Sequence, residues 1–318
     1  MTRPRILLTR RWPRIVEERL AATYDVTLNE ADTPLDEAEM IAAMRSHDAL
    51  CPTVTDKITR NVLAAEGRRA RIVGNYGAGF EHIDLSAARE QGIAISNTPD
   101  VLTEATADIA MTLILMAMRR AGEGERELRS GDWAGWRPTH LLGRSLDGKL
   151  LGLVGFGRIA RAVTDRARAF GMEIAYHSRR AVPDMPQEAY YASLGELAER
   201  ADVLSLHAPG GPGTRHMIDA AMLTRMPAHA VLVNTGRGSL IDEAALARAL
   251  ASRTIAAAAL DVYEAEPKVN PALMRLPNAV LLPHLGSATL EARTAMGMKV
   301  ADNLDRFFAG EPLLDPVA

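Results

Sequence analysis

A glycine-rich turn in the middle of the chain has the residue types and spacing of a phosphate-binding site. The stretch LLGLVGFGRIA, residues 150–160, starts as an apolar run that predicts a buried strand, then places Gly155, Gly157 and Ala160 where a helix should begin. The first glycine permits a tight turn, the second lets the backbone approach a pyrophosphate, and the small third residue lets helix and strand pack closely. A tight turn without a ligand is the alternative. A helical pattern and a second apolar run follow, which favours a dinucleotide held by helix N–H groups.

The end of that second apolar run bears on which dinucleotide is bound. Turns of this type that bind NAD have an acidic residue about 20 positions further on. Here Ser178, Arg179 and Arg180 stand in its place. Paired guanidinium donors beside a hydroxyl suit a 2′-phosphate, so the sequence predicts NADP(H), with NAD(H) as the alternative cofactor. Two solvated surface arginines are the alternative interpretation of the pair.

These residues must be positioned by a regular framework, and the chain shows one. Short β-rich runs alternate with helical patterns, which predicts an α/β protein with parallel sheets covered by helices on both faces. The predicted strands are residues 5–9, 24–28, 47–51, 71–75 and 93–97, then 149–155, 173–178, 202–208, 230–235, 255–262 and 279–284. Residues 103–130 lack proline and predict one long helix between the two series.

The two series predict two doubly wound domains. An amphipathic helix that begins at a threonine after His284 is expected to return to the first series. We therefore expect a flavodoxin-like substrate domain from residues 1–98 and 289–318, and a Rossmann dinucleotide-binding domain from residues 99–288.

Composition excludes several classes of partner and site. The net charge of −3 gives no basic footprint for nucleic acid or an anionic membrane, and no apolar run approaches the length of a membrane span. The single cysteine, Cys51, excludes internal disulfides and paired-cysteine metal motifs, so no metal site is expected. The chain is expected to be cytoplasmic, because a lone cysteine suits a reducing compartment and no signal peptide is present.

Three further clusters follow predicted strands of the second series: VNTGRGSLID (233–242), LDVYEAEP (260–267) and PHLGSAT (283–289). With these the whole chain resembles the D-isomer-specific 2-hydroxyacid dehydrogenases. NYGAGFEHIDL near residue 80, GDWAGWRP near residue 135 and the arginine-rich strand end make it most similar to the glyoxylate/hydroxypyruvate reductases of that family.

The resemblance implies that Arg237, Glu266 and His284 are catalytic, and the chemistry agrees. Reducing a 2-keto acid needs a cation for the carboxylate and the polarised carbonyl, which Arg237 supplies, and an acid that protonates the alkoxide, which suits His284. Glu266 would orient that imidazole and keep it protonated. Taken singly, the three are as consistent with a solvated arginine, a loop carboxylate and a structural histidine. Their order on successive strand ends makes that combination improbable.

The resemblance also implies substrate and cofactor contacts. Backbone amides of Ala78 and Gly79 are expected to bind the substrate carboxylate as an anion nest, with Val54, Arg237 and His284 as further substrate contacts; a glycine turn without a ligand is the alternative. The implied cofactor contacts are Thr106, Gly155, Phe156, Gly157, Arg158, Ile159, Ser178, Arg179, Arg180, His207, Ala208, Pro209, Thr214, Thr235, Asp261 and Gly286. A homodimer is expected, with the segment around Trp133 and Trp136 either reaching the partner's site or forming an ordinary dimer contact.

The predicted function is NADP(H)-dependent reduction of small 2-keto acids such as glyoxylate and hydroxypyruvate to D-2-hydroxy acids. The alternatives are an NAD-dependent D-2-hydroxyacid or phosphoglycerate-type dehydrogenase and a dinucleotide-sensing interaction protein on the same fold. Glu266 argues against a formate dehydrogenase, because those enzymes have glutamine there.

Overall fold

The computed structural model describes residues 3–317 and divides into two compact units. Unit 1 comprises the chain up to Leu102 together with the segment from Ala288 onward, and unit 2 comprises Thr103–Ser287. Among the described residues, no helix is long and apolar enough to cross a membrane.

Unit 1 is built on a five-stranded parallel sheet in the order β2-β1-β3-β4-β5, which is the flavodoxin-like order. Its strands are β1 (Arg5–Leu8), β2 (Asp25–Leu28), β3 (Ala49–Cys51), β4 (Ile72–Gly74) and β5 (Ala94–Ser96). Its helices are α1 (Arg14–Thr23), α2 (Glu37–Ser46), α3 (Arg60–Leu63), α4 (Leu85–Glu90) and α12 (Leu290–Ala309).

Both faces of this sheet are buried. Successive strand residues point to opposite faces, so Leu7 joins one apolar cluster with α2 and α3, while Ile6 and Leu8 join another with α1 and α12. Helix α12 begins where the Thr289 side chain accepts a hydrogen bond from the Ala292 amide, as an N-cap should. The last helix of the chain therefore completes the core of the first strands.

Unit 2 is built on a six-stranded parallel sheet in the order β11-β10-β9-β8-β6-β7. Its strands are β6 (Leu150–Val154), β7 (Glu173–His177), β8 (Val203–Leu206), β9 (Val231–Asn234), β10 (Ala257–Leu260) and β11 (Ala279–Leu281). Its helices are α5 (Thr103–Met118), α6 (Ala121–Ser130), α7 (Arg158–Ala169), α8 (Leu194–Arg200), α9 (Ala220–Arg225), α10 (Glu243–Ala251) and α11 (Pro271–Met274), with the short 3₁₀ turns η1 (Gln187–Ala189) and η2 (Gly238–Leu240).

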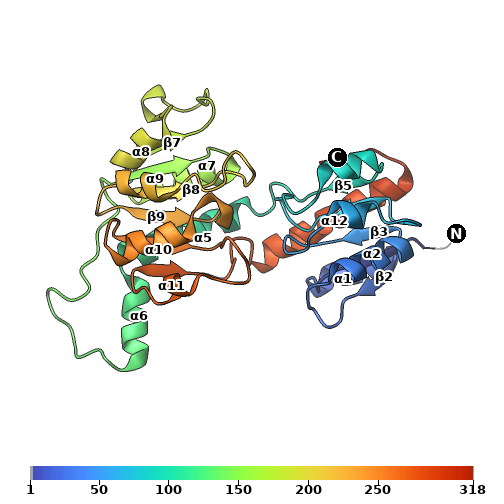
Figure 1. Cartoon of the computed structure of the whole chain (residues 1–318), viewed down its shortest axis with the longest axis horizontal. Helices are drawn as coiled ribbons and strands as arrows, with labels where there is room; N and C mark the ends of the chain where they lie inside the picture. Colours follow the sequence, from blue (N-terminus) through green and yellow to red (C-terminus); the bar gives the residue numbers. More distant parts are fainter. Residues whose placement is uncertain (1–2, 318) are drawn as a thin grey trace. The chain divides into compact units, whose positions relative to one another are not determined.

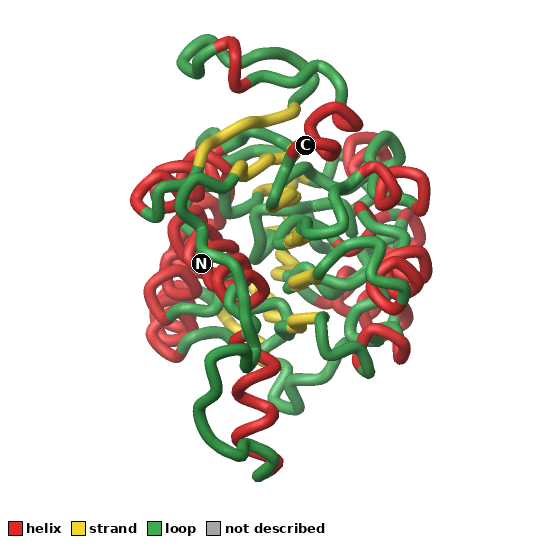
Figure 2. The backbone as a smooth tube through the Cα atoms, turned by 90° about the vertical axis from the view of Figure 1, so that its left-hand side faces the viewer, coloured by secondary structure: helices red, strands yellow, loops and turns green. Residues whose placement is uncertain are grey.

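The unit 2 sheet is a Rossmann sheet whose third strand is reduced to one bridge. Tyr190 pairs in parallel with Tyr176 of β7, beyond the edge of the six strands. Counting that bridge as the third strand gives the order 3-2-1-4-5-6-7, which is the 3-2-1-4-5-6 order of dinucleotide-binding domains with β11 added as a seventh strand at the opposite edge. Figure 2 shows the strands as a central layer with helices on both sides, and a separate apolar cluster fills each side. The predicted α/β class with a flavodoxin-like and a Rossmann sheet is confirmed.

The prediction of one helix over residues 103–130 is wrong. Helix α5 ends at Met118 and α6 starts at Ala121, because Arg120 adopts a left-handed conformation with φ of 53°. The reason lies further along the chain, where the Arg144 amide donates to the Met118 carbonyl and occupies a position that a continuing helix would need. Figure 1 shows α6 and the segment after it extending away from the unit 2 sheet.

Candidate active site

His284 and Glu266 form a hydrogen-bonded pair in unit 2. Glu266 follows β10 and His284 follows β11, and the His284 Nδ1 lies 2.8 Å from the Glu266 Oε2. Because a carboxylate only accepts, Nδ1 carries the proton of this bond. Among the described residues, the Nε2 of His284 has no hydrogen-bond partner. The His284 side chain is 36% exposed. The pair thus presents one imidazole nitrogen to a ligand while the other is fixed.

His284 is held in a strained backbone conformation. Its φ is 56°, in the left-handed region that residues other than glycine seldom adopt. Asp261 stabilises this turn with three acceptors: its carbonyl accepts from the His284 amide at 2.9 Å, and its two carboxylate oxygens accept from the Leu285 and Gly286 amides, each at 2.7 Å. Strain of this kind persists where neighbouring contacts enforce it and is concentrated at functional sites.

Two acidic groups at this turn are shifted in opposite directions. Burial raises the pKa of Asp261, although its two amide donors oppose the shift. Burial acts in the same sense on Glu266, but the bond and charge of His284, the Tyr263 amide at 2.9 Å and the charge of Arg237 outweigh it, so the pKa of Glu266 is lowered. Glu266 therefore remains ionised beside the imidazole at neutral pH.

Arg237 lies on a turn that packs directly against the Glu266 loop. A Cβ on the neighbouring Gly238 would lie 1.9 Å from the Tyr263 carbonyl carbon, so only glycine permits this approach. Asn234, fully buried at the end of β9, shapes the turn: its Nδ2 donates to the Arg237 carbonyl at 2.9 Å and its Oδ1 accepts from the Gly236 amide at 3.0 Å. The half-buried Arg237 side chain is thereby placed within electrostatic range of Glu266.

The glycine turn after β6 has the form that a pyrophosphate needs. Gly155 has φ of 84°, and a Cβ there would lie 2.8 Å from the Ala208 amide nitrogen, so the turns after β6 and β8 approach closely. Nothing lies within 4 Å of the Cβ position of Gly157, the N-cap of α7, which leaves open space beside the first amides of that helix. Directly after β9, the buried Thr235 Oγ1 has no hydrogen-bond partner among the described residues. Unfilled space and an unpaired hydroxyl fit a bound dinucleotide.

Ser178, Arg179 and Arg180 form the turn directly after β7. The Ser178 Oγ donates to the Arg180 carbonyl at 2.6 Å, which closes the turn. Both arginine side chains are exposed, and no acidic side chain that the structure describes pairs with either of them. Their guanidinium groups are accordingly available to a ligand.

The other expected cofactor residues are distributed around the same sheet edge. The Cβ position of Gly286 lies 3.3 Å from the Asp261 Oδ2 and 3.5 Å from the Thr106 Oγ1, which brings these three together. Desolvation lowers the pKa of His207 to about 4, so this histidine is neutral at neutral pH, and its Nε2 lies 2.9 Å from the Ser205 Oγ.

Some expected cofactor side chains are engaged within the protein. Phe156 is buried, with its ring centroid 4.4 Å from that of Tyr176, and Ile159 packs into the same apolar cluster. Thr214 donates through its Oγ1 to the Pro209 carbonyl at 2.8 Å. Phe156 and Ile159 therefore serve the core with their side chains, which leaves their backbone for a ligand.

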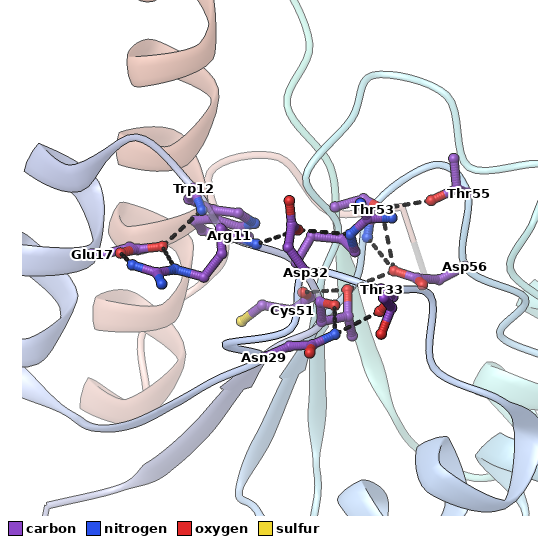
Figure 3. Close-up of polar contacts among 12 residues, drawn as sticks. Arg11, Trp12, Glu17, Asn29, Asp32, Thr33, Cys51, Thr53, Thr55 and Asp56 are labelled. Carbon is purple, nitrogen blue, oxygen red and sulfur yellow. Dashed lines mark hydrogen bonds and ion pairs between the residues drawn. The ribbon is translucent and has the colours of Figure 1, made fainter.

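The expected substrate residues of unit 1 lie on adjoining loops. Val54 follows β3, and its Cγ1 lies 2.5 Å from the Cβ position of Gly77, so it packs directly on the glycine turn that contains Ala78 and Gly79. Asp56 fixes the Val54 loop: its Oδ2 accepts from the Thr53 amide at 2.7 Å and from the Thr9 Oγ1 at 2.5 Å (Figure 3).

Comparison with known proteins identifies the family. Residues 111–286 match the model of the NAD-binding domain of D-isomer specific 2-hydroxyacid dehydrogenases. A glyoxylate reductase of Thermococcus litoralis is 41% identical over 97% of this chain and 95% of its own length, and a glycerate dehydrogenase of Hyphomicrobium methylovorum is 38% identical over 98% of each. The chain belongs to the D-isomer specific 2-hydroxyacid dehydrogenases.

Solved structures agree with this membership of the dehydrogenase family. An NADPH-dependent glyoxylate/hydroxypyruvate reductase of Sinorhizobium meliloti, solved with NADP and malonate, superposes with a TM-score of 0.90 at 39% identity, covering 100% of this chain and 97% of its own. A Thermus thermophilus protein superposes with a TM-score of 0.91 at 40% identity, covering 99% of this chain and 100% of its own. The predicted resemblance to this family is confirmed.

Several residues that shape this dehydrogenase site were not expected from the sequence. Asn234, Asp56 and Glu243 are buried and each holds a turn or loop through hydrogen bonds; the Glu243 Oε1 accepts from the Glu264 amide at 2.6 Å. Asparagine and aspartate next to a glycine turn are a recognisable signal, because their side chains bond to backbone two or three residues away. Among the described residues, no group of acidic, histidine or cysteine side chains could hold a metal ion.

Proposed function

We propose that this dehydrogenase reduces small 2-keto acids, glyoxylate and hydroxypyruvate among them, to D-2-hydroxy acids with NADP(H). The observation that carries the proposal is the His284–Glu266 pair at 2.8 Å with Arg237 on the adjoining turn. An ionised carboxylate, an imidazole with one open nitrogen and a guanidinium are the groups that carbonyl reduction requires. The names of the two relatives, a glyoxylate reductase and a glycerate dehydrogenase, support this substrate class.

The proposed role of each side chain follows from its chemistry. Arg237 binds the carboxylate and the carbonyl oxygen of the substrate, because a guanidinium offers paired donors. The amides of Ala78 and Gly79 bind the carboxylate, and Val54 contacts the substrate beside them. His284 donates a proton from Nε2 to the carbonyl oxygen as the alkoxide forms, while Glu266 holds Nδ1 and stabilises the protonated ring. When bound, NADPH supplies the hydride that becomes the hydrogen on C2 of the product.

The proposed preference for NADP(H) rests on the turn after β7. Two exposed arginines without described acidic partners, beside the Ser178 hydroxyl, are suited to a 2′-phosphate, and no carboxylate is present there to repel it. The remaining cofactor contacts are assigned to the glycine turn and the first residues of α7, to residues 207–209, and to Thr106, Thr214, Thr235, Asp261 and Gly286. NAD(H) remains the alternative cofactor.

We also propose a cytoplasmic homodimer. Helix α6 and the segment after it expose four large apolar side chains: Leu128 at 63%, Trp133 at 51%, Trp136 at 81% and Leu142 at 65%. Aromatic side chains exposed to this degree are typical of protein interfaces. Sedimentation of the protein and of a Trp133→Ser/Trp136→Ser variant tests this, since the variant should shift from dimer to monomer.

Steady-state kinetics test the proposed reaction. The purified protein should oxidise NADPH in the presence of glyoxylate or hydroxypyruvate, more efficiently than NADH. The glycerate formed from hydroxypyruvate should have the D configuration, whereas the glycolate formed from glyoxylate is achiral. A protein that binds NADPH but turns over neither of these acids nor any other small 2-keto acid would instead be a dinucleotide-sensing protein on this fold.

A further inference from the structure

The turn after β4 uses its carbonyl groups and leaves its amides open. Gly77 O accepts from the Asn75 Nδ2 at 3.0 Å, Ala78 O accepts from the Asn97 Nδ2 at 2.8 Å, and Gly79 O accepts from the Asn75 Nδ2 at 2.8 Å. Within the described part of the chain, no acceptor lies within hydrogen-bond reach of the Ala78 or Gly79 amide. Both residues are half-buried, so their N–H groups can meet a ligand.

Planarity of the peptide bond links these two facts. In a trans peptide the C=O of one residue and the N–H of the next point in opposite directions. The Gly77 carbonyl accepts from the Asn75 Nδ2 and from the Thr98 amide, each at 3.0 Å, and these two donors turn the Ala78 N–H to the opposite side. The hydrogen bond from the Asn97 Nδ2 fixes the Ala78 carbonyl, so the Gly79 N–H points away from Asn97. Asn97 therefore sets the direction of the Gly79 amide, and Asn75 sets that of the Ala78 amide together with the Thr98 amide.

Asn75 has no freedom to rotate away from this arrangement. It is fully buried, and since its Nδ2 must donate to two carbonyls, its Oδ1 must accept. The donor is the Nε2 of His82, at 3.0 Å. Every hydrogen-bonding atom of the Asn75 side chain is thus paired, which is what a buried amide requires.

We propose that Asn75 and Asn97 are positioning residues that aim the Ala78 and Gly79 amides at the substrate carboxylate. The inference rests on the proposed function, which makes these amides the carboxylate-binding groups, and it adds the residues that determine their geometry. Neither asparagine touches the substrate in this scheme.

Two variants and one matched control test the proposal. Asn97→Ala frees the Ala78 carbonyl, and Asn75→Ala frees the Gly79 carbonyl and weakens the hold on Gly77. Asn29→Ala is the control, because the Asn29 Nδ2 also donates to two backbone carbonyls, Thr9 at 2.8 Å and Thr33 at 2.6 Å, on another loop of unit 1 (Figure 3). The measurements are KM for glyoxylate, the inhibition constant of the unreactive carboxylate oxamate, kcat, KM for NADPH and Tm.

Misdirected amides weaken a charge-assisted contact, so both Asn75→Ala and Asn97→Ala should raise KM for glyoxylate and the inhibition constant of oxamate together, by roughly tenfold. KM for NADPH should stay within about twofold, kcat should change less than KM for glyoxylate, and Asn29→Ala should lower Tm without moving either carboxylate constant.

The result that overturns the inference is a folded Asn97→Ala protein with unchanged carboxylate constants, or an equal rise in the Asn29→Ala control. If Asn75→Ala does not fold, Asn97→Ala decides alone, because Asn97 is only half-buried. A wild-type protein that reduces no 2-keto acid contradicts the proposed function as well, whereas normal wild-type turnover with unmoved constants contradicts the inference alone.

Discussion

Each unit has one turn to which we assign ligand contacts, and the two turns are held in the same way but carry different chemical groups. In unit 1, the fully buried Asn75 follows β4 and holds the turn that contains Ala78 and Gly79; in unit 2, the fully buried Asn234 ends β9 and holds the turn that contains Arg237. In both, a neutral amide pairs with backbone groups at the carboxyl end of a parallel strand, where ligands of open α/β sheets bind.

The difference lies in what each turn presents. The unit 1 turn offers backbone amides, whose charge does not change with pH. The unit 2 turn contains the ionisable Arg237 and packs against the Glu266 loop, where Glu266 pairs with His284, which follows the buried Asp261 in the same site. Carboxylate binding by the first turn should therefore depend on geometry alone, whereas proton transfer and its pH dependence should belong to the second.

The largest effect is expected for His284→Ala, which removes the proposed proton donor. General acids of this kind contribute about 10²–10⁴-fold, so kcat should fall by that range. His216→Ala is a matched control in the same unit, because His216 also pairs with a glutamate, Glu264 at 2.6 Å, and also has a left-handed backbone, with φ of 50°. Its kcat should stay within severalfold of the wild type. Equal losses in both variants would show that His284 acts only through structure.

Arg237→Lys should have the next largest effect. An ammonium is a point charge and cannot hold two oxygens in a planar fork, so kcat/KM for glyoxylate should fall on the order of a hundredfold. The same exchange at Arg215, which pairs with Glu264 at 2.8 Å, conserves charge outside the proposed site and should leave kcat/KM nearly unchanged. Near-normal activity of Arg237→Lys removes Arg237 from the site and weakens the contrast between the two turns.

A smaller and more selective effect is expected when Arg179 and Arg180 are both replaced by alanine. Each charged hydrogen bond to a phosphate is worth about 1.5–3 kcal/mol before screening at an open surface, so KM for NADPH should rise roughly tenfold to a hundredfold. KM for NADH should change little. Arg168→Ala removes an exposed arginine of α7 and controls for the loss of one of the two positive charges. A wild type that prefers NADH, or a double variant that keeps its NADPH preference, contradicts the NADP(H) assignment.

The sequence predicted the strands better than the turns between them. All eleven predicted strands are present, because buried parallel strands are dense runs of apolar residues that can be recognised locally. The break at Arg120 was missed because it depends on Arg144, far along the chain. Asn75 and Asn234 bond to backbone groups two to four residues away, so the adjoining glycines are a local signal for them. Asn97 bonds to Ala78, 19 residues earlier, so its role depends on the tertiary fold. The left-handed backbone of His284 could not be predicted from the sequence either, because residues in this conformation are usually glycines and position 284 is a histidine.

The smallest effect concerns Glu266 and Glu243, whose Oε1 accepts from the Glu264 amide of the Glu266 loop. Their contributions to the free energy of unfolding should change with pH in opposite directions. The pKa of Glu266 is lowered from its ordinary 4.5, so its contribution to stability is complete above pH 4.5 and is lost as pH falls through the folded pKa. Burial, with the charges of Glu264 and Glu266, raises the pKa of Glu243 above 4.5, so ionised Glu243 destabilises the fold and this cost appears as pH rises through the folded pKa.

Urea unfolding of the wild type, Glu266→Gln and Glu243→Gln between pH 3.5 and 7 measures this contrast. The free energy of unfolding of the wild type minus that of Glu266→Gln should increase with pH. The free energy of unfolding of the wild type minus that of Glu243→Gln should decrease with pH. Each change should be on the order of 1 kcal/mol, which corresponds to a few degrees in Tm. Each variant serves as the other's control, because both remove one carboxylate from the same region of unit 2. Parallel slopes would mean that the two carboxylates share one environment, and the lowered pKa of Glu266 could then not be assigned to its bond with His284.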